Sequence, residues 1–244
     1  MASNKLKREL IVSPSMCGED SCMSIAAVFD LFQDTATMHA DTLDIGPAGM
    51  KRRKMFWVIT KTVMRIFRRP EMMDEISSET WIQAAERVSC ERDFAIKSGD
   101  EVLADGRSIW AVISRETGKL VHMDQLYPVG LDFDKPAPEG IAFERLGKKY
   151  EDADHIGTYT VRSVDIDLGG HMNNVNYVRA MLGCFSTEEI RDIGIKGVEV
   201  NYISQTYEGD EIEFRLRDAE NGLEIGALND DGKTVFSAKL YTDM

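Results

Sequence analysis

The chain has 244 residues, of which 43% are hydrophobic and 29% are charged, so it can form one large domain or two of ordinary size. Its net charge of -13 argues against nucleic acid as the main partner, because binding to phosphates requires a basic face. No apolar run approaches the ~18 residues of a membrane span, and the first residues lack the apolar core of a signal peptide. We therefore expect no membrane span and a cytoplasmic protein.

The cysteines and histidines show no metal-binding pattern. The four cysteines form no C-x-x-C pair, and the four histidines have no ligand spacing with them. The simple interpretation is a reduced chain in which the cysteines pack as small hydrophobic residues. We expect no metal site.

The first half of the chain reads as a short strand, a long helix and then several strands. Residues 10–13 are β-formers, and apolar residues recur at helical spacing from Ile25 to Ala36, with Ser24 as a candidate cap. The helix is expected to fade near Gly46. The segments rich in β-formers that follow are 56–60, 76–82, 87–96 and 102–113.

The second half repeats this order. A strand-like segment at 157–166 precedes a helical face, which comprises Val175, Val178, Leu182 and Phe185. In the segment 212–217, apolar and charged residues alternate, which is typical of a half-buried antiparallel strand. The other predicted strands are 198–202, 223–228 and 234–241.

A proline-rich segment separates the two halves. Residues 127–140 contain half of the six prolines of the chain. We predict an N-terminal domain at residues 1–126, a linker at 127–150 and a C-terminal domain at 151–244. Each half can bury its helix by wrapping an antiparallel sheet around it, which is an α+β arrangement. Two such sheets can also pair edge to edge and so remove exposed strand edges.

The most informative stretch is 165–178, where carboxylates, a glycine pair, a histidine and asparagines precede the second helical pattern. The start of a helix presents unpaired N–H groups and favours negative charge, so it suits a polarised carbonyl. Asparagine and aspartate are equally common as helix caps, and a glycine pair is common in turns. The chemistry alone therefore supports a structural role as well as a functional one.

The sequence Asp165-Ile166-Asp167-Leu168-Gly169-Gly170-His171-Met172-Asn173-Asn174-Val175-Asn176-Tyr177 resembles the active-site segment of acyl-acyl-carrier-protein (acyl-ACP) thioesterases. The family pattern is approximately D-x-D-x-N-x-H-V-N-N-x-x-Y. The resemblance spans nearly the whole chain. It implies two tandem hotdog domains, each a long helix wrapped by an antiparallel sheet. It also implies that the N-terminal domain binds the acyl chain and that the C-terminal domain is catalytic.

Hydrolysis of a thioester requires a water molecule, a group that activates it and donors for the oxyanion, but no cofactor. The candidate that activates water or attacks directly is Asp167. His171 could donate to the carbonyl or orient Asp167, and Asn173 with the early helix N–H groups would stabilise the oxyanion. The residues expected to line the substrate here are Gly169, Gly170 and Asn174.

Two positions depart from the family pattern. Gly169 stands where the family has asparagine, and Gln205 aligns with the catalytic glutamate of the family. Thr206 occupies the neighbouring position, which is cysteine or serine in relatives, and we assign it to substrate binding. Because glutamine cannot act as a base, Gln205 can only position water or a carbonyl. An acyl-CoA thioesterase and a non-catalytic acyl-binding protein with a degenerate site remain alternatives.

The expected partner is acyl carrier protein with a phosphopantetheine-linked acyl chain. Trp57 matches a family strand near the acyl pocket. The dense basic cluster of Lys51, Arg52, Arg53 and Lys54 is the candidate docking surface for the acidic carrier, although a solvated loop explains it equally well. Because two fused halves already supply the pairing of a hotdog dimer, a monomer and a homodimer are both compatible with the sequence.

Overall fold

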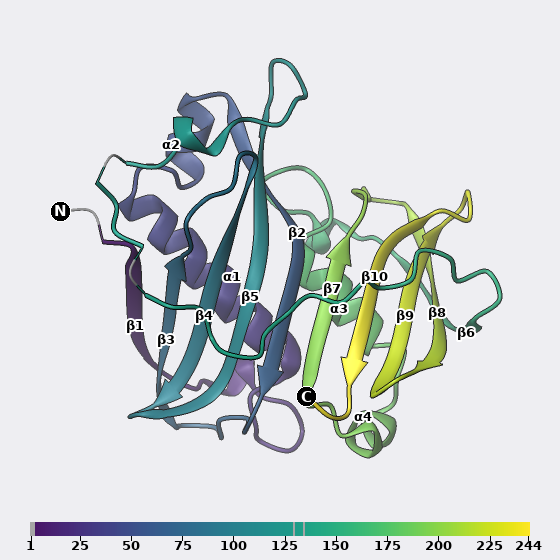
Figure 1. Ribbon diagram of the computed structural model, residues 1–244. Helices are drawn as coiled ribbons and strands as arrows, with labels where there is room; N and C mark the ends of the chain where they lie inside the picture. Colours follow the sequence, from purple (N-terminus) through teal and green to yellow (C-terminus); the bar gives the residue numbers. More distant parts are fainter. Residues whose placement is uncertain (1–2, 129, 134) are drawn as a thin grey trace. The chain divides into compact units, whose positions relative to one another are not determined.

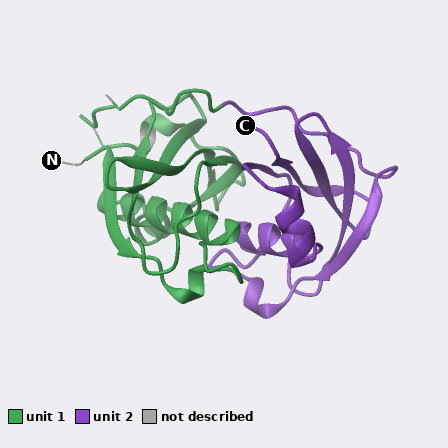
Figure 2. Cartoon of the chain, turned by 90° about the horizontal axis from the view of Figure 1, so that it is seen from below, with its two compact units in different colours: residues 1–141 green, residues 142–244 purple. Residues whose placement is uncertain are grey.

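The computed structural model describes residues 3–128, 130–133 and 135–244. The chain folds as two compact units, Met1–Ile141 and Ala142–Met244, which Figure 2 shows in green and purple. In both units an antiparallel sheet packs against a helix, as Figure 1 shows. Among the described residues, no helix combines the length and apolar character required to cross a membrane.

In the first unit, helix α1 lies against a five-stranded antiparallel sheet whose strand order is β1-β3-β4-β5-β2. The helix begins where predicted, because the Ser24 hydroxyl accepts a hydrogen bond from the Ala27 backbone N–H at 3.2 Å. The elements are β1 (Lys5–Ile11), η1 (Pro14–Met16), α1 (Ile25–Thr42), α2 (Pro47–Arg52), β2 (Met55–Ile66), β3 (Glu75–Ile82), β4 (Ser89–Ser98), β5 (Glu101–Ser114) and η2 (Met123–Gln125).

The core of the first unit lies between α1 and the sheet. Phe32 of α1 stacks on Phe94 of β4 with ring centroids 4.5 Å apart. Full burial of a phenylalanine side chain stabilises a fold by about 1.5–3 kcal/mol. Gly106 on β5 makes room for this stack, since a Cβ atom there would lie 2.5 Å from the Phe32 ring. The apolar face of α1 therefore determines which part of the sheet packs against the helix.

In the second unit, the sheet has the order β7-β10-β9-β8-β6 and is also antiparallel. Its helix α3 has 9 residues, against 18 in α1. The predicted helical face was too long, because the chain turns after Gly183 and starts a new helix with Ser186 as its cap. The elements are β6 (Asp154–Thr160), η3 (Ser163–Asp165), α3 (Asn174–Leu182), α4 (Thr187–Ile193), β7 (Gly197–Tyr202), β8 (Glu211–Ala219), β9 (Gly222–Asn229) and β10 (Thr234–Tyr241).

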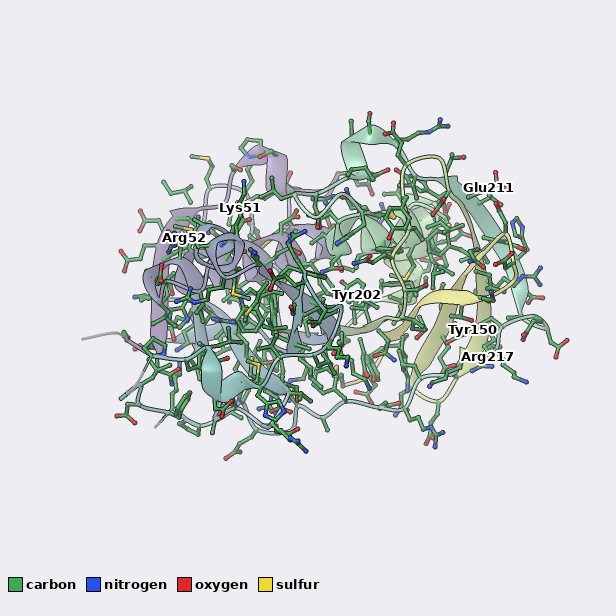
Figure 3. The ribbon with its side chains drawn as sticks, turned by 90° about the horizontal axis from the view of Figure 1, so that it is seen from above. Lys51, Arg52, Tyr150, Tyr202, Glu211 and Arg217 are labelled. Atoms are coloured by element: carbon green, nitrogen blue, oxygen red, sulfur yellow. The ribbon has the colours of Figure 1, made fainter. Side chains whose placement is uncertain are left out.

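The segment that precedes β6 is attached to the sheet of the second unit. Tyr150 is 1% exposed and packs on Gly226 of β9. The Arg217 guanidinium lies over the Tyr150 ring at 4.8 Å from its centroid, and both side chains are labelled in Figure 3. The end of the segment predicted as a linker thus belongs to the core of the second unit.

Candidate functional site

A tight hairpin between η3 and α3 carries the motif residues. The Asp167 N–H donates to the His171 carbonyl at 3.0 Å, and the Gly170 N–H donates to the Asp167 carbonyl at 3.0 Å. Gly170 has a φ of 81°, a left-handed conformation that glycine adopts without steric cost. The hairpin therefore holds Asp167 and His171 at opposite ends of one turn.

Asp167 and His171 face each other across this turn. Asp167 Oδ1 lies 3.7 Å from His171 Nδ1, which is beyond hydrogen-bond length. The same oxygen accepts the Gly169 backbone N–H at 2.6 Å. The side chains of His171 and Asp167 are 20% and 29% exposed, so both are partly buried and both can be reached from solvent.

Asp165, the other carboxylate of the motif, has a structural role. It is 5% exposed, and its Oδ2 accepts hydrogen bonds from the Tyr159 hydroxyl and the Arg162 N–H, both at 2.8 Å. Burial and the Asp165 carboxylate raise the pKa of Tyr159, so the phenol stays a donor. The Asp165 backbone carbonyl also accepts the Asn173 N–H at 2.8 Å. Asp165 thereby fixes the point at which α3 begins.

Asn173 and Asn174 are the first residues of the α3 region. Asn173 is the N-cap, and its Oδ1 accepts the Val175 N–H at 2.9 Å. Asn174 is the first helical residue and is half-buried. The amide oxygen of Asn173 thus serves the helix, and the early helix N–H groups lie directly after His171 in the chain.

The segment 203–210 runs beside the hairpin, because the Met172 N–H donates to the Thr206 carbonyl at 2.9 Å. Gln205 is exposed, and its Oε1 accepts from the Tyr207 hydroxyl at 3.1 Å. Thr206 is 1% exposed, and its hydroxyl is 2.7 Å from the Tyr177 hydroxyl. The structure thus brings Gln205 to the hairpin, whereas the Thr206 hydroxyl contacts the core.

Gly169 leaves room for the imidazole of His171. A Cβ atom built at this position would lie 2.6 Å from His171 Nε2 and 2.9 Å from Asp167 Oδ1. Real side chains do not approach so closely, so any other residue here would displace one of these groups. In the sequence, Gly169 is recognised only as a departure from the asparagine of the family pattern. The position of the His171 ring against residue 169 is visible only in the structure.

The first unit contains a second copy of this loop with the same backbone hydrogen bonds. The Gly18 N–H donates to the Cys22 carbonyl at 2.9 Å, and the Met23 N–H donates to the Pro70 carbonyl at 2.8 Å. Ser24 is the cap of α1, as Asn173 is the cap of α3. The two copies correspond residue by residue: Gly18 with Asp167, Asp20 with Gly169, Cys22 with His171, Arg69 with Gln205 and Pro70 with Thr206.

Trp57 packs within the first unit. Its Nε1–H donates to the Ile45 carbonyl at 2.8 Å, and its ring meets Trp110 edge to face at 6.0 Å. It lies against a buried cluster that includes Leu43 and Val112. Its contacts within this unit are structural, and its predicted contact with an acyl chain stays a prediction.

The basic cluster 51–54 carries its own acidic partners. Lys51 and Arg52 lie on α2 (Figure 3). Arg52 and Arg53 both pair with Asp44, whose pKa their hydrogen bonds hold below its usual range, and Lys54 pairs with Glu116 at 2.6 Å. Three of the four cations therefore have a carboxylate partner in the same unit.

No group of three or more histidine, cysteine, aspartate or glutamate side chains with metal-binding geometry occurs in the described parts of the chain.

The sheet-wrapped helices and the repeated loop define a tandem hotdog protein with a polar site in its second unit. The chain belongs to the acyl-ACP thioesterase family: the family's N-terminal domain matches residues 3–127, and its C-terminal domain matches residues 148–239. The resemblance inferred from the motif is thereby confirmed, as is the α+β fold class of two tandem hotdog domains.

Solved structures share this fold over the whole chain. An acyl-ACP thioesterase from Bacteroides thetaiotaomicron superposes with a TM-score of 0.84 at 22% identity, covering 98% of this chain and 97% of that one. The 12:0-ACP thioesterase from Umbellularia californica gives a TM-score of 0.83 at 21% identity, covering 97% and 96%. At these identities the likeness establishes the fold.

Curated relatives are plant enzymes. An oleoyl-acyl carrier protein thioesterase of Arabidopsis thaliana is 24% identical over 97% of this chain and 70% of its own length. A chloroplastic acyl-[acyl-carrier-protein] hydrolase of Cuphea viscosissima is 26% identical over 76% of this chain and 48% of its own length. The chain thus spans between about half and about 70% of the length of these relatives.

Proposed function

We propose that the chain hydrolyses the thioester of fatty acyl-acyl carrier protein and releases free fatty acid and carrier protein. The observation that carries the proposal is the Asp167–His171 pair at the start of α3, 3.7 Å apart, in a chain whose two halves both match this family. An imidazole beside a carboxylate can activate water, and the first N–H groups of a helix favour the negative charge that develops on the carbonyl oxygen.

Gln205 fits the role of a donor. Its Oε1 accepts the Tyr207 hydroxyl, so its amide NH₂ group is the end left to donate to an oxyanion. An amide here cannot take a proton from water, so the activation of water belongs to the hairpin. The difference from relatives at Gln205 and Gly169 is also the basis of the rival proposal, a non-catalytic protein that binds acyl chains.

The carrier is the second part of the proposal. The ion pairs of Arg52, Arg53 and Lys54 are exposed, and exposed pairs contribute little to stability because water and salt screen them. An acidic carrier can therefore replace Asp44 and Glu116 at little cost. We assign acyl-chain binding to the first unit, with Trp57 as a lining residue, on the family resemblance. The cytoplasmic location and the choice between monomer and homodimer remain predictions.

Purified protein tested on acyl-ACP and acyl-CoA donors with the same acyl groups would decide between these proposals. The wild type should release fatty acid faster from the carrier protein, and His171→Gln should lower kcat by about 10²–10⁴-fold. His155→Gln is the matched control, because His155 is an exposed histidine of the same unit that contacts Thr158. Faster turnover of acyl-CoA would favour an acyl-CoA thioesterase, and absence of turnover on every donor would favour a non-catalytic acyl-binding protein.

A further inference from the structure

We propose that His171, rather than Asp167, takes the proton from water, and that residue 169 is glycine because a side chain there would cover the nitrogen that does so. This inference rests on the proposed function. It adds the identity of the base and a positioning residue, Gly169, which departs from the family pattern.

The surroundings of the imidazole determine which nitrogen is free. His171 Nδ1 lies 3.4 Å from the Met172 carbonyl oxygen and 3.7 Å from Asp167 Oδ1. Both neighbours are acceptors, so the neutral ring carries its hydrogen on Nδ1. The lone pair is then on Nε2, the ring nitrogen beside Gly169. A carboxylate behind the protonated nitrogen of a histidine base orients the ring and stabilises the imidazolium that forms.

Asp167 has a different task in the same turn. Its Oδ1 accepts the Gly169 N–H at 2.6 Å, a contact that closes the hairpin. A carboxylate engaged in this way holds the turn and the ring together. Its Oδ1 also lies on the Nδ1 side of the imidazole, at 3.7 Å, so its negative charge favours the imidazolium that forms when Nε2 takes a proton.

Gly169 controls access to Nε2. A Cβ atom there would lie 2.6 Å from Nε2 and 3.2 Å from Cδ2 of His171. Its φ is not in the left-handed region, so the backbone does not require glycine at this position, in contrast to Gly170 with φ 81°. The nearest groups, the His171 ring and the Asp167 carboxylate, are both ends of side chains, so a side chain at 169 would move them from their present positions.

The loop of the first unit shows where a side chain at this position would go. Asp20 is the counterpart of Gly169, and its carboxylate pairs with Arg69, the counterpart of Gln205. A side chain at this point of the loop reaches across to the neighbouring segment. Gly169 has no side chain to do so, and the atoms nearest to the position of its missing Cβ are those of His171 and Asp167.

The proposed step balances in atoms and charge. Nε2 of His171 accepts a proton from water while the hydroxide oxygen bonds to the thioester carbon. The tetrahedral intermediate places its oxyanion toward the Gln205 amide and the positive end of the α3 dipole. When the C–S bond breaks, the imidazolium gives its proton to the thiolate of the pantetheine arm. The products are the fatty acid and the thiol of the carrier protein, and His171 returns to its neutral form.

The test combines a comparison of two hairpin variants with a matched pair of glycine variants. His171→Gln should lower kcat for acyl-ACP more than Asp167→Asn does, because Asp167→Asn keeps the proposed base and an oxygen that accepts the Gly169 N–H, and loses only the charge. Gly169→Ala should lower kcat at least tenfold and leave KM within about twofold, because the methyl group contacts Nε2 and not the bound chain. Gly18→Ala places a methyl group at the corresponding loop of the first unit, 3.4 Å from its nearest neighbour, and should leave turnover unchanged.

The possible outcomes separate this inference from the proposed function. A loss of kcat in Asp167→Asn as large as that in His171→Gln, or larger, would overturn the imidazole base while leaving the thioesterase in place. The same holds if Gly169→Ala keeps full kcat. Should Gly169→Ala fail to fold, as judged by circular dichroism, the comparison of His171→Gln with Asp167→Asn still decides. A wild type without turnover on any acyl donor refutes both proposals.

Discussion

His39 should make the stability of the first unit depend on pH between about 4 and 6.5. It lies on α1, is 1% exposed and uses both ring nitrogens. Nε2–H donates to the Ser3 carbonyl at 2.9 Å, and Nδ1 accepts from the Arg92 guanidinium at 2.9 Å. Protonation would place a hydrogen on Nδ1 against a cation. Burial, followed by the charge of Arg92, therefore lowers the pKa of His39 from 6.5 to about 4.

The sign and size of the effect follow from this pKa. Between about pH 6.5 and pH 4, the unfolded chain binds a proton at His39 and the folded chain does not. The free energy of unfolding should thus fall as the pH decreases through this window and be independent of His39 above about pH 7. At ~1.4 kcal/mol per pH unit, the full loss is about 3 kcal/mol.

Urea titrations followed by tryptophan fluorescence would measure this loss. The three tryptophans, Trp57, Trp81 and Trp110, all lie in the first unit, so the signal reports on the unit that contains His39. His39→Gln removes the titrating group, and His122→Gln is the control in the same unit. The wild type should lose about 3 kcal/mol more than His39→Gln between pH 7.5 and pH 4. Parallel pH curves for these two proteins would refute the reasoning.

Three further predictions concern the packing, the start of α3 and the carrier. Gly106→Ala should destabilise the first unit by about 1–3 kcal/mol in urea, because the new methyl group lies 2.5 Å from Phe32; an unchanged midpoint would contradict the packing described. Tyr159→Phe should destabilise the second unit by about 1.5–3 kcal/mol, measured by circular dichroism, since it removes a donor from the Asp165 carboxylate. A loss no larger than that of Tyr207→Phe, an exposed phenol, would show that Asp165 does not depend on it. Replacing Lys51, Arg52, Arg53 and Lys54 by glutamine should raise KM for acyl-ACP at low salt and leave KM for a short acyl-thioester unchanged; an unaltered KM for the carrier would exclude docking at this cluster.

The regular elements with strong local signals could be predicted from the sequence. The start of α1 follows from apolar residues at helical spacing after Ser24, and the strand β8 follows from its alternation of apolar and charged residues. The order strand, helix, strands occurs twice, and this repetition by itself indicates the fold class. These signals act over a few residues, so the sequence contains them directly.

Elements that depend on contacts far along the chain were not predictable. Gly46-Pro47 was interpreted as the end of a helix, but proline is also suited to the first turn, and α2 begins there. Tyr150 was assigned to a linker, and only the glycine at position 226 gives it a buried place on β9. The ion pair of Lys54 with Glu116 was not predictable, because the two residues are far apart in the sequence.

The chemistry of the site was predictable in its residues but not in its geometry. Asp167 and His171 are recognisable from their spacing and from the family pattern. That the imidazole lies against residue 169 follows only from the turn that Gly170 makes with its positive φ. Gly170 therefore suits the backbone conformation of the turn, whereas glycine at position 169 leaves space for the His171 ring. The sequence alone does not distinguish these two roles.

A comparison of the two units distinguishes residues that the loop needs in order to fold from residues that are available for catalysis. Both units contain the same hairpin, the same helix cap and the same aspartate accepting a backbone N–H, Asp74 in one and Asp210 in the other. What a loop needs in order to fold is present in both copies. The positions at which the copies differ most in chemistry, Asp167, Gly169, His171 and Gln205, are not required by the fold, because the first unit folds the same loop with glycine, aspartate, cysteine and arginine there. Their identities in the second unit therefore need a reason other than folding, and the proposed role of the Asp167–His171 pair in hydrolysis supplies one.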